Sequence, residues 1–213
     1  VQEGVTSFLA TTMTMDNDSI LKALESIKNY IELDNKSGAK VLGIHLEGPF
    51  ISPLHAGAQD PKNIIKFNKE LFDKYLKISN NHIKEVTLAY EENGKEMVEY
   101  LVDHNIVASI GHTDCKSSLL KEGIDAGISC STHTYNAMRG IHHREIGTVG
   151  QVMLNDKVNC ELICDLHHVS MDAIKLLFKN KGKDKIILIT DSMRAKYLEE
   201  GNYTLGGLPV IVK

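Results

Sequence analysis

The sequence lacks several features that mark particular classes of protein. No apolar run approaches the roughly eighteen residues of a membrane span, and no segment has the pattern of a signal peptide. There is no basic run and no interleaving of basic with aromatic residues, and the formal net charge is -4. We therefore expect a cytoplasmic protein whose partners include neither a membrane nor a nucleic acid.

The sequence also lacks a Cys-x-x-Cys pair. Its four cysteines are Cys115, Cys130, Cys160 and Cys164. Cys160 and Cys164 are four apart in an apolar, strand-like run, where such residues point to the same face. We expect all four to be buried, reduced thiols, with a metal or redox site as the less favoured alternative.

Repeats, linkers and low-complexity tracts are absent as well, and 213 residues suffice for one sizeable domain. Apolar runs of strand length alternate with segments of helical period about seven times, which indicates a parallel sheet. Such a sheet is either an open doubly wound sheet or a (β/α)8 barrel. The expected strands are 5–14, 41–46, 86–90, 106–110, 128–132, 158–164 and 186–189, and the expected helices are 16–33, 61–78, 95–105, 114–127 and 170–181.

The ends of the predicted helices carry recognisable signals. Asp18 or Ser19 is expected to cap the first helix, and Asp114 the fourth, which should end at Gly127. The tail differs from the alternating series, because Gly206-Gly207 separates two β-prone runs and predicts a hairpin over 202–213. The chain starts almost directly in a strand-like segment and stops just after a new β pattern begins, so we expect it to be a piece of a longer protein.

Chemically capable side chains recur where the predicted strands end. Glu47, His112, His133 and Asp191 each follow an apolar run, and Asp165, His167 and His168 follow another. In a barrel the carboxyl ends of the strands converge on one mouth, whereas an open sheet would spread them across its width. The repeated placement therefore favours the barrel and makes these residues neighbours.

One carboxylate and two imidazoles form a reasonable ligand set for zinc that leaves a position for water. Amide hydrolysis also needs a group that takes a proton from water and returns one to the leaving amine, and Asp191 could do both. Each of these residues could instead have a purely structural role, because strand histidines are often packed core residues and Asp191 could cap a loop. We expect His45 to serve packing only.

Several motifs carry a family resemblance. They are His45–Phe50 (HLEGPF), Gly111–Thr113 (GHT), Thr132–Met138 (THTYNAM) and Ile189–Met193 (ITDSM), with Arg144–Gly147, Asp165 and His168 between them. In this order they resemble the N-acetylglucosamine-6-phosphate deacetylases of the amidohydrolase superfamily, over nearly the whole chain.

The resemblance implies an α/β fold, a TIM-type (β/α)8 barrel of the amidohydrolase kind that is incomplete at both ends. It implies hydrolysis of N-acetylglucosamine 6-phosphate to glucosamine 6-phosphate and acetate, with a divalent metal, expected to be zinc, and a homodimer that contacts the phosphate across its interface. By position, the implied metal ligands are Glu47, His112 and His133, the catalytic residue is Asp191, and the substrate-binding residues are Ala58, Asn136, Ala137, Arg144 and His168. A guanidinium such as that of Arg144 can engage two phosphate oxygens at once.

The sequence departs from the family pattern in three ways. It has no His-x-His motif, and Gln59 stands where many members have a histidine, so that this side chain could orient but not take a proton. From the resemblance we also expect that the segment completing the barrel and a small β-sandwich lies outside this sequence, on its C-terminal side. We therefore predict a barrel over residues 1–195 that lacks its first strand, and the start of a C-terminal β-sandwich over 196–213. The alternatives are an amidohydrolase acting on another amide, or an inactive piece that binds metal or phosphosugar.

Overall fold

The computed structural model describes residues 4–33 and 38–212 and contains a parallel sheet followed by a hairpin. The seven strands of the sheet are β1 (Ser7–Thr12), β2 (Lys40–Glu47), β3 (Ile83–Leu88), β4 (Val107–Ile110), β5 (Cys130–Ser131), β6 (Asn159–Ile163) and β7 (Ile186–Ile189). The hairpin consists of β8 (Gly201–Leu205) and β9 (Leu208–Val212), which pair antiparallel.

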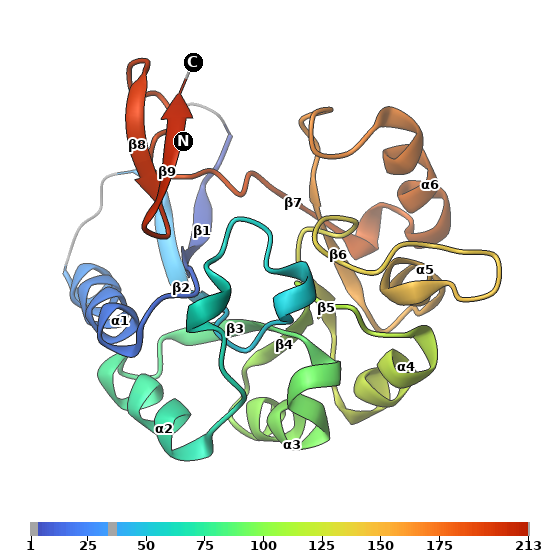
Figure 1. Cartoon of the computed structure of the whole chain (residues 1–213), viewed down its shortest axis with the longest axis horizontal. Helices are drawn as coiled ribbons and strands as arrows, with labels where there is room; N and C mark the ends of the chain where they lie inside the picture. The colour runs from blue at the N-terminus through green and yellow to red at the C-terminus, as the bar shows by residue number, and fades with distance from the viewer. Residues whose placement is uncertain (1–3, 34–37, 213) are drawn as a thin grey trace.

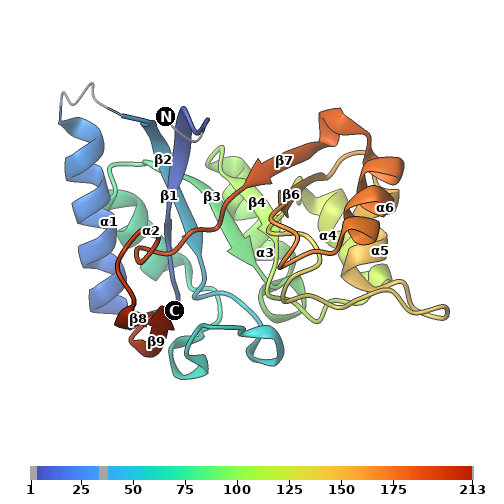
Figure 2. The same ribbon diagram turned by 90° about the horizontal axis from the view of Figure 1, so that it is seen from above.

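The seven strands lie in the sheet in the order in which they occur in the chain, and every neighbouring pair is parallel. The sheet curls instead of lying flat, with the helices on its convex side (Figures 1 and 2). In the described part of the chain, β1 and β7 end the sheet, and the curl stays open between them. This is a half-barrel, which confirms the predicted barrel architecture over the open doubly wound sheet.

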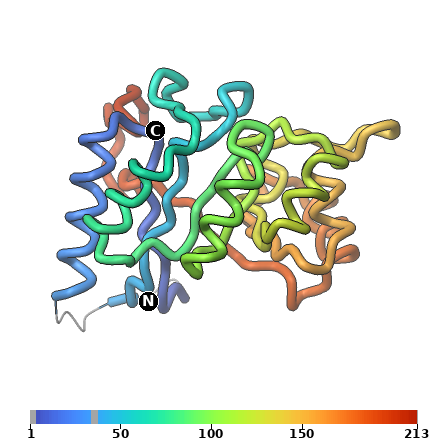
Figure 3. The backbone as a smooth tube through the Cα atoms, turned by 90° about the horizontal axis from the view of Figure 1, so that it is seen from below, coloured from blue at the N-terminus to red at the C-terminus, as the bar shows by residue number. Residues whose placement is uncertain are grey.

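Among the described residues, six α-helices cover the convex side: α1 (Asn17–Glu32), α2 (Lys69–Ile78), α3 (Tyr90–Asp103), α4 (Ser117–Ala126), α5 (Gly147–Leu154) and α6 (Met171–Lys181). Contacts join α1 to α2 and then run in sequence from α3 to α6, so that helices adjacent in the chain are adjacent in space. The tube in Figure 3 shows this succession of strand and helix around the curl.

Alternation along the strands separates an apolar face from a polar one. In β3, Val86 and Leu88 belong to the core that packs against the helices, while Glu85 and Thr87 are buried polar residues. Because successive strand side chains point to opposite faces, the polar residues lie on the concave side. Along β3 the concave face is thus polar, while the helices cover the apolar face.

The first helix begins where it was predicted, but its predicted cap was wrong, and so were the predicted starts of the second and third helices. Asp16, not Asp18 or Ser19, caps α1 by accepting a hydrogen bond from the backbone N–H of Ser19 at 3.0 Å. The second helix starts at Lys69 after the cap Asn68, and the preceding 61–63 form only a 3-10 turn. The third starts early, at Tyr90, and kinks at Gly94.

Asp114 does not cap α4, contrary to prediction. Its carboxylate instead pairs with Arg139 and with His55, and the side chain of Glu145 accepts the hydrogen bond of the Ser117 N–H in the first turn of the helix. The predicted end at Gly127 is confirmed, since this residue is the C-cap with a φ of 131°.

The hairpin prediction is confirmed. Gly206 and Gly207 have φ angles of 57° and 82°, the left-handed geometry that a tight two-residue hairpin turn requires. Its assignment to a β-sandwich, and the domain boundary near residue 195, stay predictions. Three cysteines are buried as expected, but Cys164 is exposed and that prediction was wrong. Among the described residues, no helix is long and apolar enough to cross a membrane.

Candidate active site

Four of the predicted site residues lie at the carboxyl ends of different strands. Glu47 is the last residue of β2, whereas His112, His133 and Asp191 follow β4, β5 and β7 by two residues. These last three have φ angles of 46°, 29° and 47°, a left-handed conformation that costs energy in residues with a side chain. The chain therefore turns sharply after each strand, and the strain is concentrated where the side chains meet.

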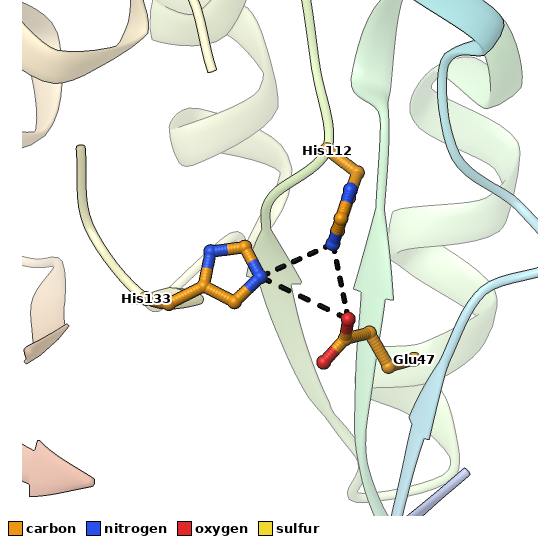
Figure 4. Close-up of side chains that lie close together, drawn as sticks. All are labelled: Glu47, His112 and His133. Carbon is orange, nitrogen blue, oxygen red and sulfur yellow. Dashed lines mark hydrogen bonds and ion pairs between the residues drawn. The ribbon is translucent and has the colours of Figure 1, made fainter. Parts of the chain in front are cut away.

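Glu47, His112 and His133 form a compact triangle of possible metal ligands (Figure 4). Oε1 of Glu47 lies 3.0 Å from Nε2 of His112 and 3.8 Å from Nε2 of His133, and the two Nε2 atoms are 3.1 Å apart. Ligands of a tetrahedral zinc, with bonds of about 2.0–2.1 Å, would be separated by about 3.3–3.4 Å. The triangle thus has the dimensions of a zinc ligand set.

The tautomer of His112 strengthens this fit. Its Nδ1 lies 2.7 Å from the backbone carbonyl oxygen of His55, which can only accept a hydrogen bond, so Nδ1 carries the proton. In the neutral ring Nε2 then presents a lone pair toward the Glu47 carboxylate and toward His133. A divalent metal could take this lone pair together with a carboxylate oxygen of Glu47 and Nε2 of His133, so the donor set fits such a metal.

The charges within the triangle support one another. Burial alone would raise the pKa of Glu47, but the neighbouring imidazoles of His112 and His133 hold its pKa well below the ordinary value in the metal-free site. Burial would lower the pKa of His133, yet its hydrogen bond and attraction to Glu47 raise that pKa above the ordinary value, with a further contribution from Asp191. The site therefore favours an ionised carboxylate and attracts positive charge.

A cavity of about 690 Å³ opens over the triangle. Its lining includes the three possible ligands, Asp191, and four of the predicted substrate-binding residues, namely Ala58, Asn136, Ala137 and His168. The volume is within the range of small-molecule sites in proteins. Residues from five separate loops thus converge on one space, as the sequence predicted.

Two predicted residues have more particular surroundings. His168 is oriented by Asp165, whose carboxylate lies 2.6 Å from Nδ1, leaving Nε2 available. Arg144 does not line the cavity; it lies in an exposed turn between His142 and Glu145. The structure thus brings together every predicted site residue except Arg144, and the predicted role of Arg144 stays a prediction.

A second buried group was not predicted from the sequence. His45, Glu85 and Glu161 have possible ligand atoms within 4.8 Å of one another, and all three side chains lie on the concave face. His45 bonds to Thr87 Oγ1 at 2.7 Å, which agrees with a packing role. The alternation of polar residues within apolar strands could have placed each side chain on the concave face, but it does not show that the three lie together.

Comparison with known proteins identifies close relatives. The chain is 47% identical to the N-acetylglucosamine-6-phosphate deacetylase of Bacillus subtilis (strain 168), over 100% of this chain and 54% of the relative. It is 35% identical to an N-acetylgalactosamine-6-phosphate deacetylase of Escherichia coli O157:H7, over 97% of this chain and 54% of that protein. No protein-family model matches the chain.

Solved structures agree in fold. The structure resembles that of a mutant N-acetyl-D-glucosamine-6-phosphate deacetylase from Mycobacterium smegmatis in complex with N-acetyl-D-glucosamine-6-phosphate, with a TM-score of 0.93 and 29% identity. The match covers 99% of this chain and 54% of the other. The chain therefore spans about half the length of the relatives that it matches. Over that span it is homologous to N-acetylglucosamine-6-phosphate deacetylases and has their TIM-type fold.

Proposed function

We propose that this chain contains the metal-binding and catalytic residues of an enzyme that removes the acetyl group from N-acetylglucosamine 6-phosphate. The products would be glucosamine 6-phosphate and acetate. The observation that carries the proposal is the Glu47, His112 and His133 triangle at the base of a cavity that Asp191 also lines. The homology over the whole chain supplies the substrate.

The three ligands would hold a divalent metal, for which zinc is our proposal. When bound, such a metal lowers the pKa of a water molecule and polarises the scissile carbonyl. Asp191 accepts the proton of the attacking water as a carbon–oxygen bond forms at the acetyl carbon. It then gives that proton to the amide nitrogen as the carbon–nitrogen bond breaks, so that atoms and charge balance.

The remaining residues of the cavity would bind the sugar. Asn136 offers an amide and His168 an imidazole whose ring is oriented by Asp165, while Ala58 and Ala137 leave room for the substrate. Arg144 is exposed and outside the cavity, which suits a phosphate contact supplied across the interface of a homodimer. The homodimer is part of the proposal.

A second candidate substrate is N-acetylgalactosamine 6-phosphate, favoured by the 35% identity to a deacetylase of that name. The two sugars differ in the orientation of one hydroxyl, which the cavity lining alone does not distinguish. An inactive role in binding metal or phosphosugar is the alternative from a different class, since the sheet stays open between β1 and β7 in the described part of the chain.

The decisive experiment measures acetate release with added zinc, for this chain and for the complete gene product. Each is given N-acetylglucosamine 6-phosphate, N-acetylgalactosamine 6-phosphate and unphosphorylated N-acetylglucosamine. We expect the complete product to hydrolyse the first substrate fastest and to lose activity when the 6-phosphate is removed. Faster release from the galactosamine derivative would reverse the assignment of substrate. No release from any of them by the complete product would overturn the enzymatic proposal.

A further inference from the structure

Gln59 lies between the metal-ligand triangle and the end of the first strand. This residue is only 3% exposed, and its side chain makes three polar contacts, the longest of them between its Nε2 and Nε2 of His112 at 3.4 Å. Oε1 accepts a hydrogen bond from the backbone N–H of Thr14 at 2.7 Å, and Nε2 donates to Oε1 of Glu47 at 2.9 Å. Because the Thr14 N–H can only donate, the amide has one orientation, and its NH2 group must face Glu47.

The same loop also restrains a second ligand. The carbonyl of His55 fixes the ring and tautomer of His112, so residues 55–59 contact two members of the triangle. His133 differs, since its Nδ1 is buried and has no hydrogen-bond partner among the described residues. Orientation from outside the triangle is thus supplied to Glu47 and His112 by one short segment, which we call the orienting loop (residues 55–59).

The backbone leaves space for these contacts. A Cβ atom added to Gly48, whose φ is 72°, would lie 1.9 Å from Thr14 Oγ1 and 3.1 Å from Gln59 Oε1. A Cβ atom at Gly57 would lie 3.4 Å from the ring of His112. Glycine at these two positions therefore leaves room for Thr14 and Gln59 beside residue 48, and for the ring of His112 beside the loop.

We propose that Gln59 is a positioning residue for the metal, which holds the Glu47 carboxylate in place by linking it to the backbone of Thr14. This proposal rests on the metal site of the proposed function and adds to it a residue that orients a ligand from outside. A neutral amide suits the role because it donates to a carboxylate without competing for the metal as a further charged ligand. Groups in such positions commonly change metal affinity about 10- to 100-fold when replaced.

The test is the zinc dissociation constant of the complete gene product, measured on metal-free protein by competition with a chromophoric chelator. Gln59→Met keeps the length of the side chain and removes all three of its polar contacts. We expect the dissociation constant to rise about 10- to 100-fold. The cobalt-substituted variant should also show an altered visible spectrum, since the carboxylate ligand has lost its restraint.

Ser79→Ala is the matched control. Ser79 is fully buried and donates a hydrogen bond to the carbonyl of Leu76 at 3.1 Å, at the end of α2 and away from the triangle. Both variants lose buried hydrogen bonds, but only Gln59→Met loses one to a ligand. Zinc affinity within about twofold of wild type in Gln59→Met, or an equal loss in Ser79→Ala, would overturn the proposal.

A second variant covers the case in which Gln59→Met does not fold. Gln59→Asn keeps the amide but is one methylene shorter, so it cannot span from Thr14 to Glu47, and its zinc affinity should also fall. Unchanged affinity in Gln59→Asn would count against the proposal. If the metal site itself were wrong, the wild-type protein would bind no zinc. If only the deacetylase assignment were wrong, the zinc affinities of the wild type and the variants would be unaffected.

Discussion

The two buried His/Glu groups of the concave face contain the same residue types in opposite proportions. The upper group (Glu47, His112, His133) has one carboxylate and two imidazoles, whereas the lower group (His45, Glu85, Glu161) has two carboxylates and one imidazole. They are neighbours, because His45 and Glu47 are two residues apart on β2 and point to the same face. The upper group faces the 690 Å³ cavity, and the lower faces one of about 550 Å³ that extends to β1 and β7.

The proportions set opposite charge states. In the upper group the imidazoles hold the pKa of Glu47 far below its ordinary value. In the lower group burial and the nearby charge of Glu85 raise the pKa of Glu161 to about 8, so that this carboxyl keeps its proton at neutral pH. The upper group thus presents an ionised carboxylate with lone pairs to a metal, whereas the lower one is stabilised by a proton. The presence of His and Glu side chains therefore does not by itself identify a metal site. The ratio of imidazoles to carboxylates must also favour the ionised carboxylate.

The largest expected effect tests whether the deacetylation takes place beside the upper group, with Asp191 transferring the proton. Asp191→Asn in the complete gene product should reduce turnover of N-acetylglucosamine 6-phosphate by about 10²- to 10⁴-fold, since an amide cannot carry the proton. Zinc content, measured by atomic emission, should be unchanged. Asp184→Asn, at an exposed position before β7, is the control and should keep full activity. Loss of zinc in Asp191→Asn would contradict the assigned role.

The second prediction separates the two groups by their metal affinity. His133→Gln removes a ligand of the upper group and should weaken zinc binding by more than about 100-fold. His45→Gln changes the lower group, keeps a hydrogen-bonding partner for Thr87, and should bind zinc about as tightly as wild type. Both dissociation constants can be obtained by chelator competition. An equal loss in His45→Gln would place the metal in the lower group and break the comparison.

The strands and the upper group could be predicted from the sequence because both depend on local patterns. Each ligand directly ends or follows an apolar run, and the parallel topology then brings the strand ends together. The lower group could not be predicted in this way. His45 and Glu85 are level only because of the register between β2 and β3, and Glu161 comes from β6. Register and curl are tertiary properties that no local pattern contains.

The helix α5 was missed for a related reason. Its sequence, Gly147–Leu154, has two glycines and no side-chain cap, so local propensity argues against a helix. Tertiary packing overrides this, since Val149, Val152 and Met153 are buried in the core. The unpredicted contact of Glu145 with the Ser117 N–H likewise joins residues that are distant in the chain.

The third prediction uses the raised pKa of Glu161 in the lower group, which is opposite in direction to the shift of Glu47 in the upper group. The pKa of Glu161 is about 8 in the folded protein against 4.5 ordinarily, so between these values the folded state holds a proton that the unfolded state has lost. Stability should therefore fall as the pH rises from about 4.5 to about 8. Glu161→Gln cannot titrate, and its stability relative to wild type should increase from pH 5 to pH 8 by on the order of 3 kcal/mol.

Urea unfolding of metal-free protein at the two pH values measures this difference. Glu96→Gln, on the exposed side of α3, is the matched control and should follow the wild-type profile. If the stabilities of Glu161→Gln and wild type changed in parallel between pH 5 and pH 8, the lower group would not be held by a proton.

The smallest expected effect, taken per pH unit, is the pH dependence of metal affinity in the upper group. Histidine ligands must be neutral to bind a metal, so zinc affinity should decrease as the pH falls below about 6.5. The pKa of His133 in the metal-free protein is raised by Glu47 despite its burial, so protons should begin to compete above that pH. We expect a loss of about tenfold per pH unit for each proton taken up, measured by chelator competition from pH 8 to pH 5. Affinity unchanged down to about pH 4.5, well below the pKa of an ordinary histidine, would be incompatible with histidine ligation.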